Sequence, residues 1–202
     1  MMRVVLLTFL LLAAGQSIAT DDPVSVIEES TDEVAQLIDD RRDTYSEDPE
    51  ALRDDIKSIL LPTIDEVYSA RLVLGRHGRG KEREQIEAFA NALANQLLNR
   101  YATALLEYDL KDRVEILPLA GDNTERQSRV RTRVRLDNGE RAPVDYVMRK
   151  TEEGWQVFDV IVEGISYVST FRSQIDREIR QSSFEEMLDR LESGEYKVSV
   201  DD

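Results

Sequence analysis

The stretch WQVFDVIVEGISYVSTFRSQI, from Trp155 to Ile175, decides the fold class. It begins as a strand that is apolar at both odd and even positions, and from Gly164 it changes to helical spacing. Two sets of apolar residues would point to opposite faces of this strand: Phe158, Val160 and Val162 on one, and Trp155, Val157 and Ile161 on the other. Helices on both sides of a sheet would explain the pattern. Helices on one side and a cavity for an apolar ligand on the other would explain it equally well.

Three earlier segments also have the alternating pattern of half-buried strands, at 113–119, 128–136 and 142–150. Hairpin-forming residues separate the last three strands, at 137–139 and 152–154. The chain is therefore predicted to form a twisted antiparallel sheet of four strands.

Helical spacing of apolar residues fills most of the remaining chain. The predicted helices are 23–44, a segment begun by Asp48 and Pro49, a segment from a Thr63–Glu66 capping box to Gly75, 82–108, 164–180, and 183–191 capped by Ser182. Helices before and after a sheet indicate an α+β fold with helices packed around the sheet. No linker divides it, so we expect a single domain over residues 20–202, with an acidic C-terminal tail from about residue 193.

The first residues have the order of a secretory signal peptide, with Arg3, a mostly apolar run, and small residues at Ser17 and Ala19. The run ends at Gly15, which is short of the roughly 20 residues that a membrane anchor needs. We therefore expect residues 1–19 to be cleaved and the mature chain to be exported.

The chain is strongly acidic. It carries 26 basic and 41 acidic residues, a formal net charge of −15, which becomes −16 when Arg3 leaves with the signal. Such a surface repels nucleic acid and anionic membranes. There is no cysteine, so stability has to come from an apolar core.

The sequence offers little for metal binding or nucleophilic catalysis. His77 is the only histidine, in a basic loop beside Arg76 and Arg79, and we expect a solvated turn residue. With one histidine and no thiol, no metal site and no cofactor are predicted.

Three carboxylates interrupt apolar strands: Asp145, Asp159 and Glu163. Structural ion pairs, with Arg149 or Arg172 as partner, would explain them. A catalytic role is the alternative.

Arginine occupies one whole face of the second strand, at Arg129, Arg131, Arg133 and Arg135. The pattern fits the solvated face of an outer strand. It also fits a basic docking patch for an acidic partner.

Several segments share features with one family. They are DPVSVIEESTDEV at 22–34, YSARLVLGRHGR at 68–79, NRYATALLEY at 99–108, and the run over 144–175. The most specific residues are Gly154, Trp155, Val157, Asp159, Glu163, Gly164, Ser166, Val168, Thr170 and Arg172. In these the chain resembles MlaC, the periplasmic phospholipid carrier of the maintenance-of-lipid-asymmetry system, also called the toluene-tolerance family. Gly78 departs from the family, because many relatives carry an aromatic there.

The resemblance implies a twisted sheet and helices that enclose a deep apolar pocket for the acyl chains of a phospholipid. It implies a monomeric, non-enzymatic shuttle in the periplasm. Its implied partners are an outer-membrane lipoprotein with a porin, and an inner-membrane ABC transporter with MCE domains. Helix and strand phase then suggests the pocket residues Val67, Leu72, Phe89, Leu93, Leu97, Tyr101, Tyr146, Met148, Val157 and Ile161.

Two other functions stay open. One is an enzyme in a cone-shaped fold of the nuclear transport factor type, with Asp145 or Asp159 as general base in the pocket. The other is a lipid-free adaptor that regulates a transporter.

Overall fold

The computed structural model describes residues 22–107, 113–121, 123–136 and 138–199, so the expected signal peptide lies outside the described residues. The α-helices are α1 (Pro23–Glu47), α2 (Pro49–Leu60), α3 (Glu66–Leu74), α4 (Arg83–Tyr101), α5 (Tyr167–Gln181) and α6 (Phe184–Glu192). Short 3-10 helices are η1 (Leu61–Thr63), η2 (Gly75–Gly78) and η3 (Ala102–Glu107). The strands are β1 (Val114–Ile116), β2 (Gln127–Arg135), β3 (Arg141–Thr151), β4 (Gly154–Val162) and β5 (Ile165–Ser166). No helix within these ranges is both long and apolar enough to cross a membrane.

The strands form one antiparallel meander in the order β1-β2-β3-β4-β5. Within the described residues the sheet therefore has five strands, and the predicted number of four is wrong. The additional strand arises at the turn after β4, where Glu163 and Gly164 both take positive φ, 51° and 87°. The chain turns back there, and Ile165 and Ser166 pair with the end of β4 before α5 begins.

A β-bulge in β4 explains why this strand is apolar at both odd and even positions. Val147 pairs with Asp159 but its neighbour Met148 pairs with Val157, so Phe158 is an extra residue in β4. Tyr146 and Met148 lie on one face of β3 and stand opposite Val160 and Val157 of β4. The bulge therefore shifts the side-chain alternation of β4 by one position. Val157 and Val160 therefore face the same side, which is the side of α1.

The bulge also attaches α3 to the sheet. The backbone N–H of Asp65 donates to the Val157 carbonyl at 2.9 Å, and the Ser69 hydroxyl donates to the Phe158 carbonyl at 3.0 Å. The Phe158 ring packs edge-on against Tyr68, with ring centroids 5.2 Å apart. Through these contacts Phe158, the extra residue of β4, packs against α3.

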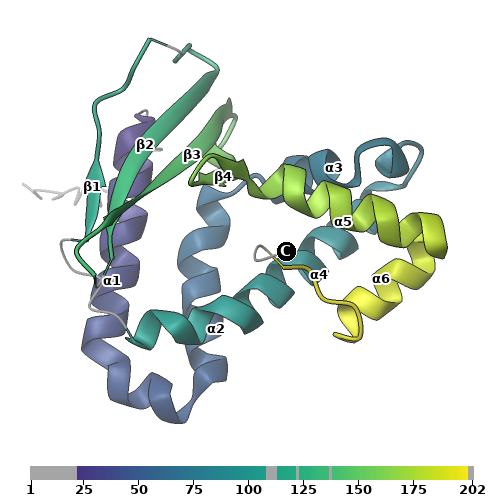
Figure 1. Cartoon of the computed structure of the whole chain (residues 1–202), viewed down its shortest axis with the longest axis horizontal. Helices are drawn as coiled ribbons and strands as arrows, with labels where there is room; N and C mark the ends of the chain where they lie inside the picture. Colours follow the sequence, from purple (N-terminus) through teal and green to yellow (C-terminus); the bar gives the residue numbers. More distant parts are fainter. Residues whose placement is uncertain (1–21, 108–112, 122, 137, 200–202) are drawn as a thin grey trace, which may run out of the picture.

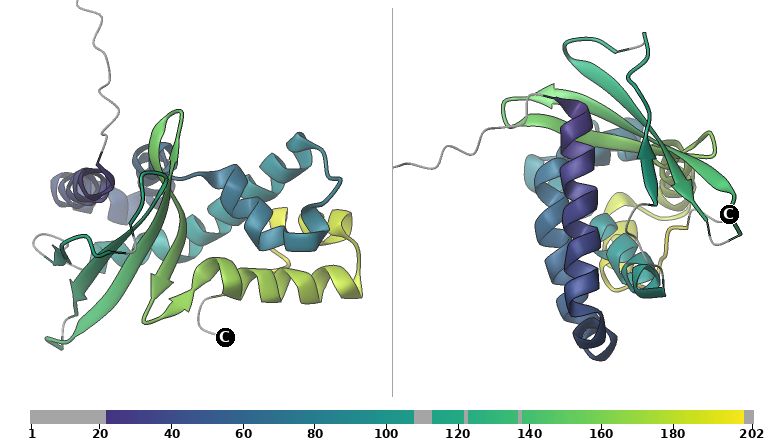
Figure 2. Two further views of the ribbon diagram at one scale, coloured as in Figure 1. Left: turned by 90° about the horizontal axis from the view of Figure 1, so that it is seen from above. Right: turned by 90° about the vertical axis from the view of Figure 1, so that its left-hand side faces the viewer.

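The molecule is elongated, with the sheet at one end and a helical bundle at the other (Figure 1). Helix α1 runs beside the sheet with α2 packed next to it, and α1 contacts β1, β2 and β4. Helices α3, α4, α5 and α6 form the bundle, which joins the sheet through α3 and α5 at β4 (Figure 2).

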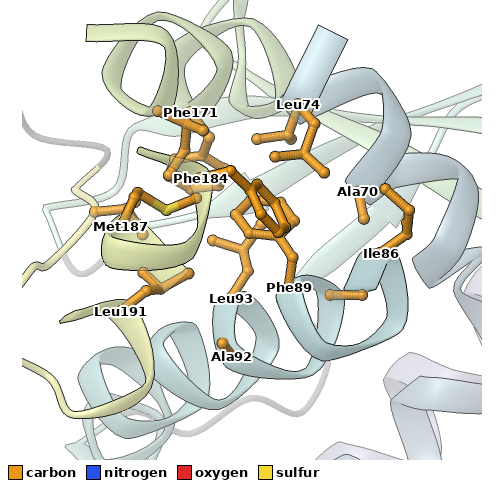
Figure 3. Packing of buried hydrophobic residues seen from close by; sticks show 14 of the residues in the cluster. Ala70, Leu74, Ile86, Phe89, Ala92, Leu93, Phe171, Phe184, Met187 and Leu191 are labelled. Atoms are coloured by element: carbon orange, nitrogen blue, oxygen red, sulfur yellow. The ribbon is translucent and has the colours of Figure 1, made fainter. Parts of the chain in front are cut away.

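The described part of the chain has an apolar core in three parts. The bundle core gathers side chains from α3, α4, α5 and α6, among them Phe89, Leu93, Phe171 and Met187 (Figure 3). A second cluster joins α1, α2 and the end of α4 around Tyr45 and Ile56. A third lies between α1 and the sheet: Ile27, Val130, Met148, Trp155 and Val157.

Three predicted helix boundaries are corrected. Helix α3 is capped by Asp65, whose side chain accepts from the Tyr68 N–H, rather than by Thr63, which lies in η1. Helix α6 is capped by Ser183 and not by Ser182. The long fourth helix ends at Tyr101, because η3 then directs Leu105 and Leu106 into the second cluster.

The segment after α6, predicted as an acidic tail, packs onto the bundle up to Ser199. Val198 is buried in the bundle core. Gln96 of α4 donates to the carbonyls of Leu191 and Tyr196 and accepts from the Val198 N–H, and Gln174 of α5 bonds both backbone groups of Ser199. The side-chain amides of Gln96 and Gln174 thus form hydrogen bonds with backbone groups of this segment, as a neighbouring strand would.

We predict that Gln96→Ala lowers the free energy of unfolding by about 1–3 kcal/mol, because it leaves partly buried backbone groups without hydrogen bonds. Urea unfolding followed by circular dichroism measures this loss. Asn99→Ala, an exposed change on the same helix, should stay within about 0.5 kcal/mol of the wild type. Equal stability of the two variants would contradict the described role of Gln96.

Candidate functional site

An apolar cavity of about 810 Å³ lies between α1 and the inner face of the sheet. Such a volume is within the range of roughly 300–1,000 Å³ that is common for sites of small ligands. The residues that line it are Ile27, Ser30, Thr31 and Val34 of α1; Leu60, Thr63, Ile64 and Leu105; Tyr146, Val157 and Val160 of β3 and β4; and Arg113, Val114, Val134, Arg135, Leu136 and Asn138.

The chain builds this cavity by holding α1 away from the sheet. Ile27 packs against the sheet near the start of α1, whereas Val34 belongs to the cluster that α1 forms with α2. Between these two anchors, α1 has small side chains at Ser30 and Thr31, and the Ser30 hydroxyl is bonded to the carbonyls of Val26 and Ile27. The wall therefore presents few polar groups that need a partner.

The cavity is suited to apolar groups. Tyr146 on its sheet side is desolvated, and this burial raises the pKa of its hydroxyl. A second hollow of about 980 Å³ adjoins the cavity at Thr31 and Val114, but its α1 wall carries the carboxylates of Glu28, Asp32 and Asp39. Carboxylates are a poor lining for hydrocarbon, so the cavity on the sheet side is the candidate site.

The residues predicted from the sequence to line a pocket are divided by the fold. Tyr146 and Val157 line the cavity, and Met148 is buried in the cluster that includes Val157. Phe89 and Leu93 belong to the bundle core, with Val67 and Leu97 packed against it. Leu72 and Tyr101 are half-buried on α3 and α4, and neither lines the described cavity. The assignment of these residues to acyl chains stays a prediction.

Ile161 lies on the other face of the sheet from the cavity. It stands opposite Asp145 in the β3–β4 pairing, whereas its neighbour Val160 stands opposite Tyr146. Strand alternation alone placed Ile161 beside Val157, and the bulge at Phe158 changed that assignment.

Sequence reasoning missed the contribution of α1 and of the chain around η1. Ile27 and Val34 are seven positions apart on one helical face, a spacing that indicated burial without showing what they face. No local sequence pattern predicts the position of Ile64, since this position depends on a β-bridge to Val157 of β4.

Two of the three carboxylates, Asp145 and Asp159, have structural partners, whereas Glu163 lies in the turn after β4. Asp145 is held by Arg129, with its Oδ2 at 2.6 Å from Nη2 and 2.9 Å from Nε. Asp159 accepts from the Ser166 hydroxyl at 2.6 Å and from the Val168 N–H at 3.0 Å, so it fixes the start of α5. Neither carboxylate lines the described cavity.

The expected partners of these carboxylates, Arg149 and Arg172, are used elsewhere. Arg149 pairs with Asp65 at 3.3 Å and lies over the Tyr68 ring. Arg172 donates from Nε to the Leu72 carbonyl at 2.6 Å. Cross-strand geometry explains the difference, because Arg129 is the diagonal neighbour of Asp145 on β2.

The arginine face of β2 serves more than one purpose. Arg129 is the partner of Asp145, and Arg133 donates to the Thr132 carbonyl at 2.9 Å. Arg135 lies at the end of β2 and lines the cavity. Docking of a partner by Arg129, Arg131, Arg133 and Arg135 stays a prediction.

His77 is not the solvated turn residue that the sequence suggested. It lies in η2 with its side chain 18% exposed, and its Nε2 is 2.8 Å from Asp176 Oδ1. The hydrogen bond from His77, and then the charges of Arg180 and Arg76, hold the pKa of Asp176 below its usual value. This cluster ties η2 to α5 in the bundle, away from the cavity.

The departure at Gly78 is a packing feature. Gly78 is buried, and a Cβ atom placed there would lie 3.2 Å from the Leu74 Cβ and 3.7 Å from the Ile86 Cδ1. An aromatic side chain at this position therefore needs a different arrangement of α3 and α4.

In the part of the chain that the structure describes, no cluster of three metal-ligating side chains is present. A helix-covered antiparallel sheet with an apolar cavity, and with Asp145 and Asp159 engaged in structural contacts, is the architecture of a small α+β ligand-binding protein.

Comparison with known proteins agrees with this class. The profile of the family described as MlaC protein matches residues 28–193. The chain is similar to toluene tolerance protein ttg2D of Pseudomonas putida, with 30% identity over 159 residues that cover 78% of this chain and 73% of that protein. It is also similar to the intermembrane phospholipid transport system binding protein MlaC of Haemophilus influenzae, with 28% identity over 169 residues, 80% and 78% of the two chains.

A solved structure shares the fold. The phospholipid-binding protein from Ralstonia solanacearum, in complex with a phospholipid, superposes with a TM-score of 0.74 at 22% identity, covering 85% of this chain and 96% of that one. The chain belongs to the MlaC family.

The Asp176 cluster gives a pH prediction. A carboxyl with a lowered folded pKa contributes stability above its unfolded pKa of about 4, and the contribution is lost as the pH falls through the lower folded value. Asp176→Asn should therefore lower Tm by about 1–3 °C at pH 7, and the difference from the wild type should narrow as the pH falls below about 4.

Thermal unfolding of both proteins at pH 7 and at pH 3 measures the difference in Tm. Asp189→Asn, an exposed change on α6, serves as the control and should show no such pH dependence. A wild-type advantage over Asp176→Asn that is the same at pH 7 and pH 3 would argue against the cluster.

Proposed function

We propose that this protein is a periplasmic phospholipid carrier that holds acyl chains in the cavity between α1 and the sheet and leaves the head group outside. The observation that carries the proposal is the apolar cavity of about 810 Å³ in a chain of the MlaC family. The names of the relatives, which include a phospholipid transport system binding protein and a phospholipid-binding protein, support the choice of ligand.

The physical need for such a carrier follows from the hydrophobic effect. Two acyl chains of about 16 carbons contain roughly 30 methylenes, and exposing them to water would cost on the order of 24 kcal/mol at ~0.8 kcal/mol each. Unassisted transfer across an aqueous gap is therefore negligible. A cavity that covers the chains removes most of that cost, and it makes fast spontaneous release equally unfavourable.

Release then has to be coupled to docking on a partner, which must favour an open form of the cavity. We propose that the partners are an outer-membrane lipoprotein with its porin and an inner-membrane ABC transporter with MCE domains. The carrier would exchange phospholipid with both and so maintain the lipid asymmetry of the outer membrane. Export by the signal peptide at 1–19 would place the monomeric protein between them.

We propose no catalytic step. Asp145 and Asp159, the carboxylates considered as general base, lie outside the described cavity and make structural hydrogen bonds. A general base has to come within hydrogen-bond reach of the proton it removes, and a ligand in this cavity would not bring it there.

The proposed acyl-chain contacts are Tyr146 and Val157, joined by Val160, Val134 and Ile64 from the same wall. We predict that Val160→Asp, which places a carboxylate in the cavity, lowers the phospholipid that copurifies with the exported protein by about tenfold. Ile161→Asp carries the same charge on the next residue, on the opposite face of β4, and should keep its lipid.

Phosphorus analysis of solvent extracts gives the amount of lipid per protein, and circular dichroism confirms that both variants are folded. If Ile161→Asp loses lipid and Val160→Asp keeps it, the cavity is assigned to the wrong face. If wild-type protein carries none, the carrier proposal fails.

We also propose that Arg131 and Arg133, on the solvent side of β2, contribute to docking on acidic partner surfaces. Arg131→Glu with Arg133→Glu should slow lipid transfer to partner-containing vesicles about tenfold at low salt, and raising the ionic strength should reduce the difference. Lipid retention should stay normal.

Arg71→Glu with Arg79→Glu changes the charge equally at exposed positions of the bundle and is the control. Transfer rates that are equal for the two double variants would refute the docking role of Arg131 and Arg133.

A further inference from the structure

Strand β1 forms one edge of the sheet, and no described strand lies on its outer side. Hydrogen bonding in an antiparallel pair alternates along the chain, and the Leu117 N–H donates to the Arg131 carbonyl of β2 at 2.9 Å. Counted back from this bond, the N–H and C=O groups of Val114 and Ile116 point away from β2. They have no hydrogen bond to a described residue, and such a row of free donors and acceptors is a template for a further strand.

A hollow of about 980 Å³ lies along this free edge, between β1 and one side of α1. Val114 and Ile116 line it from the sheet, and α1 lines it with an acidic stripe at Glu28, Asp32 and Asp39. Residues at this spacing share one face of a helix. Helix α1 runs alongside β1 and contacts it, so the acidic stripe follows the strand edge (Figure 1).

The acidic stripe is not neutralised within the described part of the chain. Glu28, Asp32 and Asp39 are exposed and make no ion pair with a described residue. Arg42 is the one cation among the described lining residues, and it donates to the Leu106 carbonyl. The hollow therefore favours a cationic ligand. It disfavours a second copy of this chain, because pairing of two β1 edges would bring two acidic stripes together.

We propose that the free edge of β1 and this hollow bind an extended basic segment of a partner protein, which adds to the sheet as a strand antiparallel to β1. Main-chain bonds to Val114 and Ile116 give affinity, and basic side chains that face α1 give specificity. Pro118, which has no N–H, follows the free edge and limits the site to a short segment. The inference does not depend on the proposed carrier function, because lipid takes no part in it.

The spacing of the acidic stripe matches that of an added strand. Glu28 and Asp32 are four residues apart on α1, which is a rise of about 6 Å. Alternate residues of a strand are about 6.6–6.8 Å apart and point to the same side. In an antiparallel pair, the residues opposite Val114 and Ile116 point to the same face as these two side chains, which is the side of α1. Lysine or arginine at every second position of the added strand therefore meets successive carboxylates.

The probe is a short, capped, fluorescently labelled peptide in which lysine alternates with threonine, a residue that favours strands and stays soluble. Fluorescence anisotropy measures its Kd for the exported protein. We expect an analogue with glutamate in place of lysine to bind at least about tenfold more weakly, and added salt to reduce the difference.

The acidic stripe is tested by Glu28→Gln with Asp32→Asn, which should weaken binding of the lysine peptide about tenfold. Glu186→Gln with Asp189→Asn removes the same charge from exposed positions of α6 and should leave the Kd unchanged. Equal Kd values for these two double variants would overturn the assignment of the site to the hollow.

Strand addition is tested by Ile116→Pro, which removes an outward N–H without removing a bond to β2. Ile116→Ala loses the same side chain and keeps the N–H, so Ile116→Pro should bind the peptide about tenfold more weakly than Ile116→Ala. Circular dichroism confirms that both variants are folded.

Methylated peptides test the same bonds on wild-type protein. N-methylation at the lysines blocks the N–H groups that face β1 and should abolish binding, whereas N-methylation at the threonines should be tolerated. Equal binding of the two methylated peptides would overturn strand addition. No binding of the lysine peptide would reject the inference and leave the carrier proposal untouched. A dimer of the peptide-free protein, with the Val114 and Ile116 amides protected from hydrogen exchange, would assign the edge to a second copy.

Discussion

The β-bulge at Phe158 is the feature on which the arrangement of the molecule depends. One extra residue in β4 reverses the side-chain alternation, so that Val157 and Val160 both face α1. It also leaves the carbonyls of Val157 and Phe158 to bond Asp65 and Ser69, at the start of α3. A regular strand would direct Val160 away from the cavity and would lose the junction with α3.

The bulge thereby separates the part of the molecule that can provide stability from the part that can hold a ligand. The bundle of α3, α4, α5 and α6 is densely packed around side chains such as Phe89 and Met187 (Figure 3). The C-terminal segment packs onto this bundle up to Ser199. Stability can come from this part, because close-packed interiors give the largest return for buried apolar area. The wall formed by α1 and the sheet can then remain incompletely filled and accept a ligand.

Much of this architecture could be predicted from periodicity and turn residues. The helices, the meander and the closure of α3 at Gly75 follow from local sequence signals. The fifth strand and the bulge do not, because Ile165 is placed by pairing with Val162, and Phe158 by packing on α3. The residues that line the cavity could not be predicted from such signals. Helical phase shows that the apolar stripe of α4 is buried, but whether it meets a ligand or other helices depends on tertiary packing, and here it meets the bundle.

The proposed function requires that a phospholipid occupies the cavity between α1 and the sheet. Native mass spectrometry of the exported protein, purified from a bacterial periplasm without detergent, tests it most directly. We expect a mass increment equal to an intact phospholipid, identified by extraction of a parallel sample. A bare polypeptide mass with no extractable lipid would contradict it and favour an adaptor that binds no lipid.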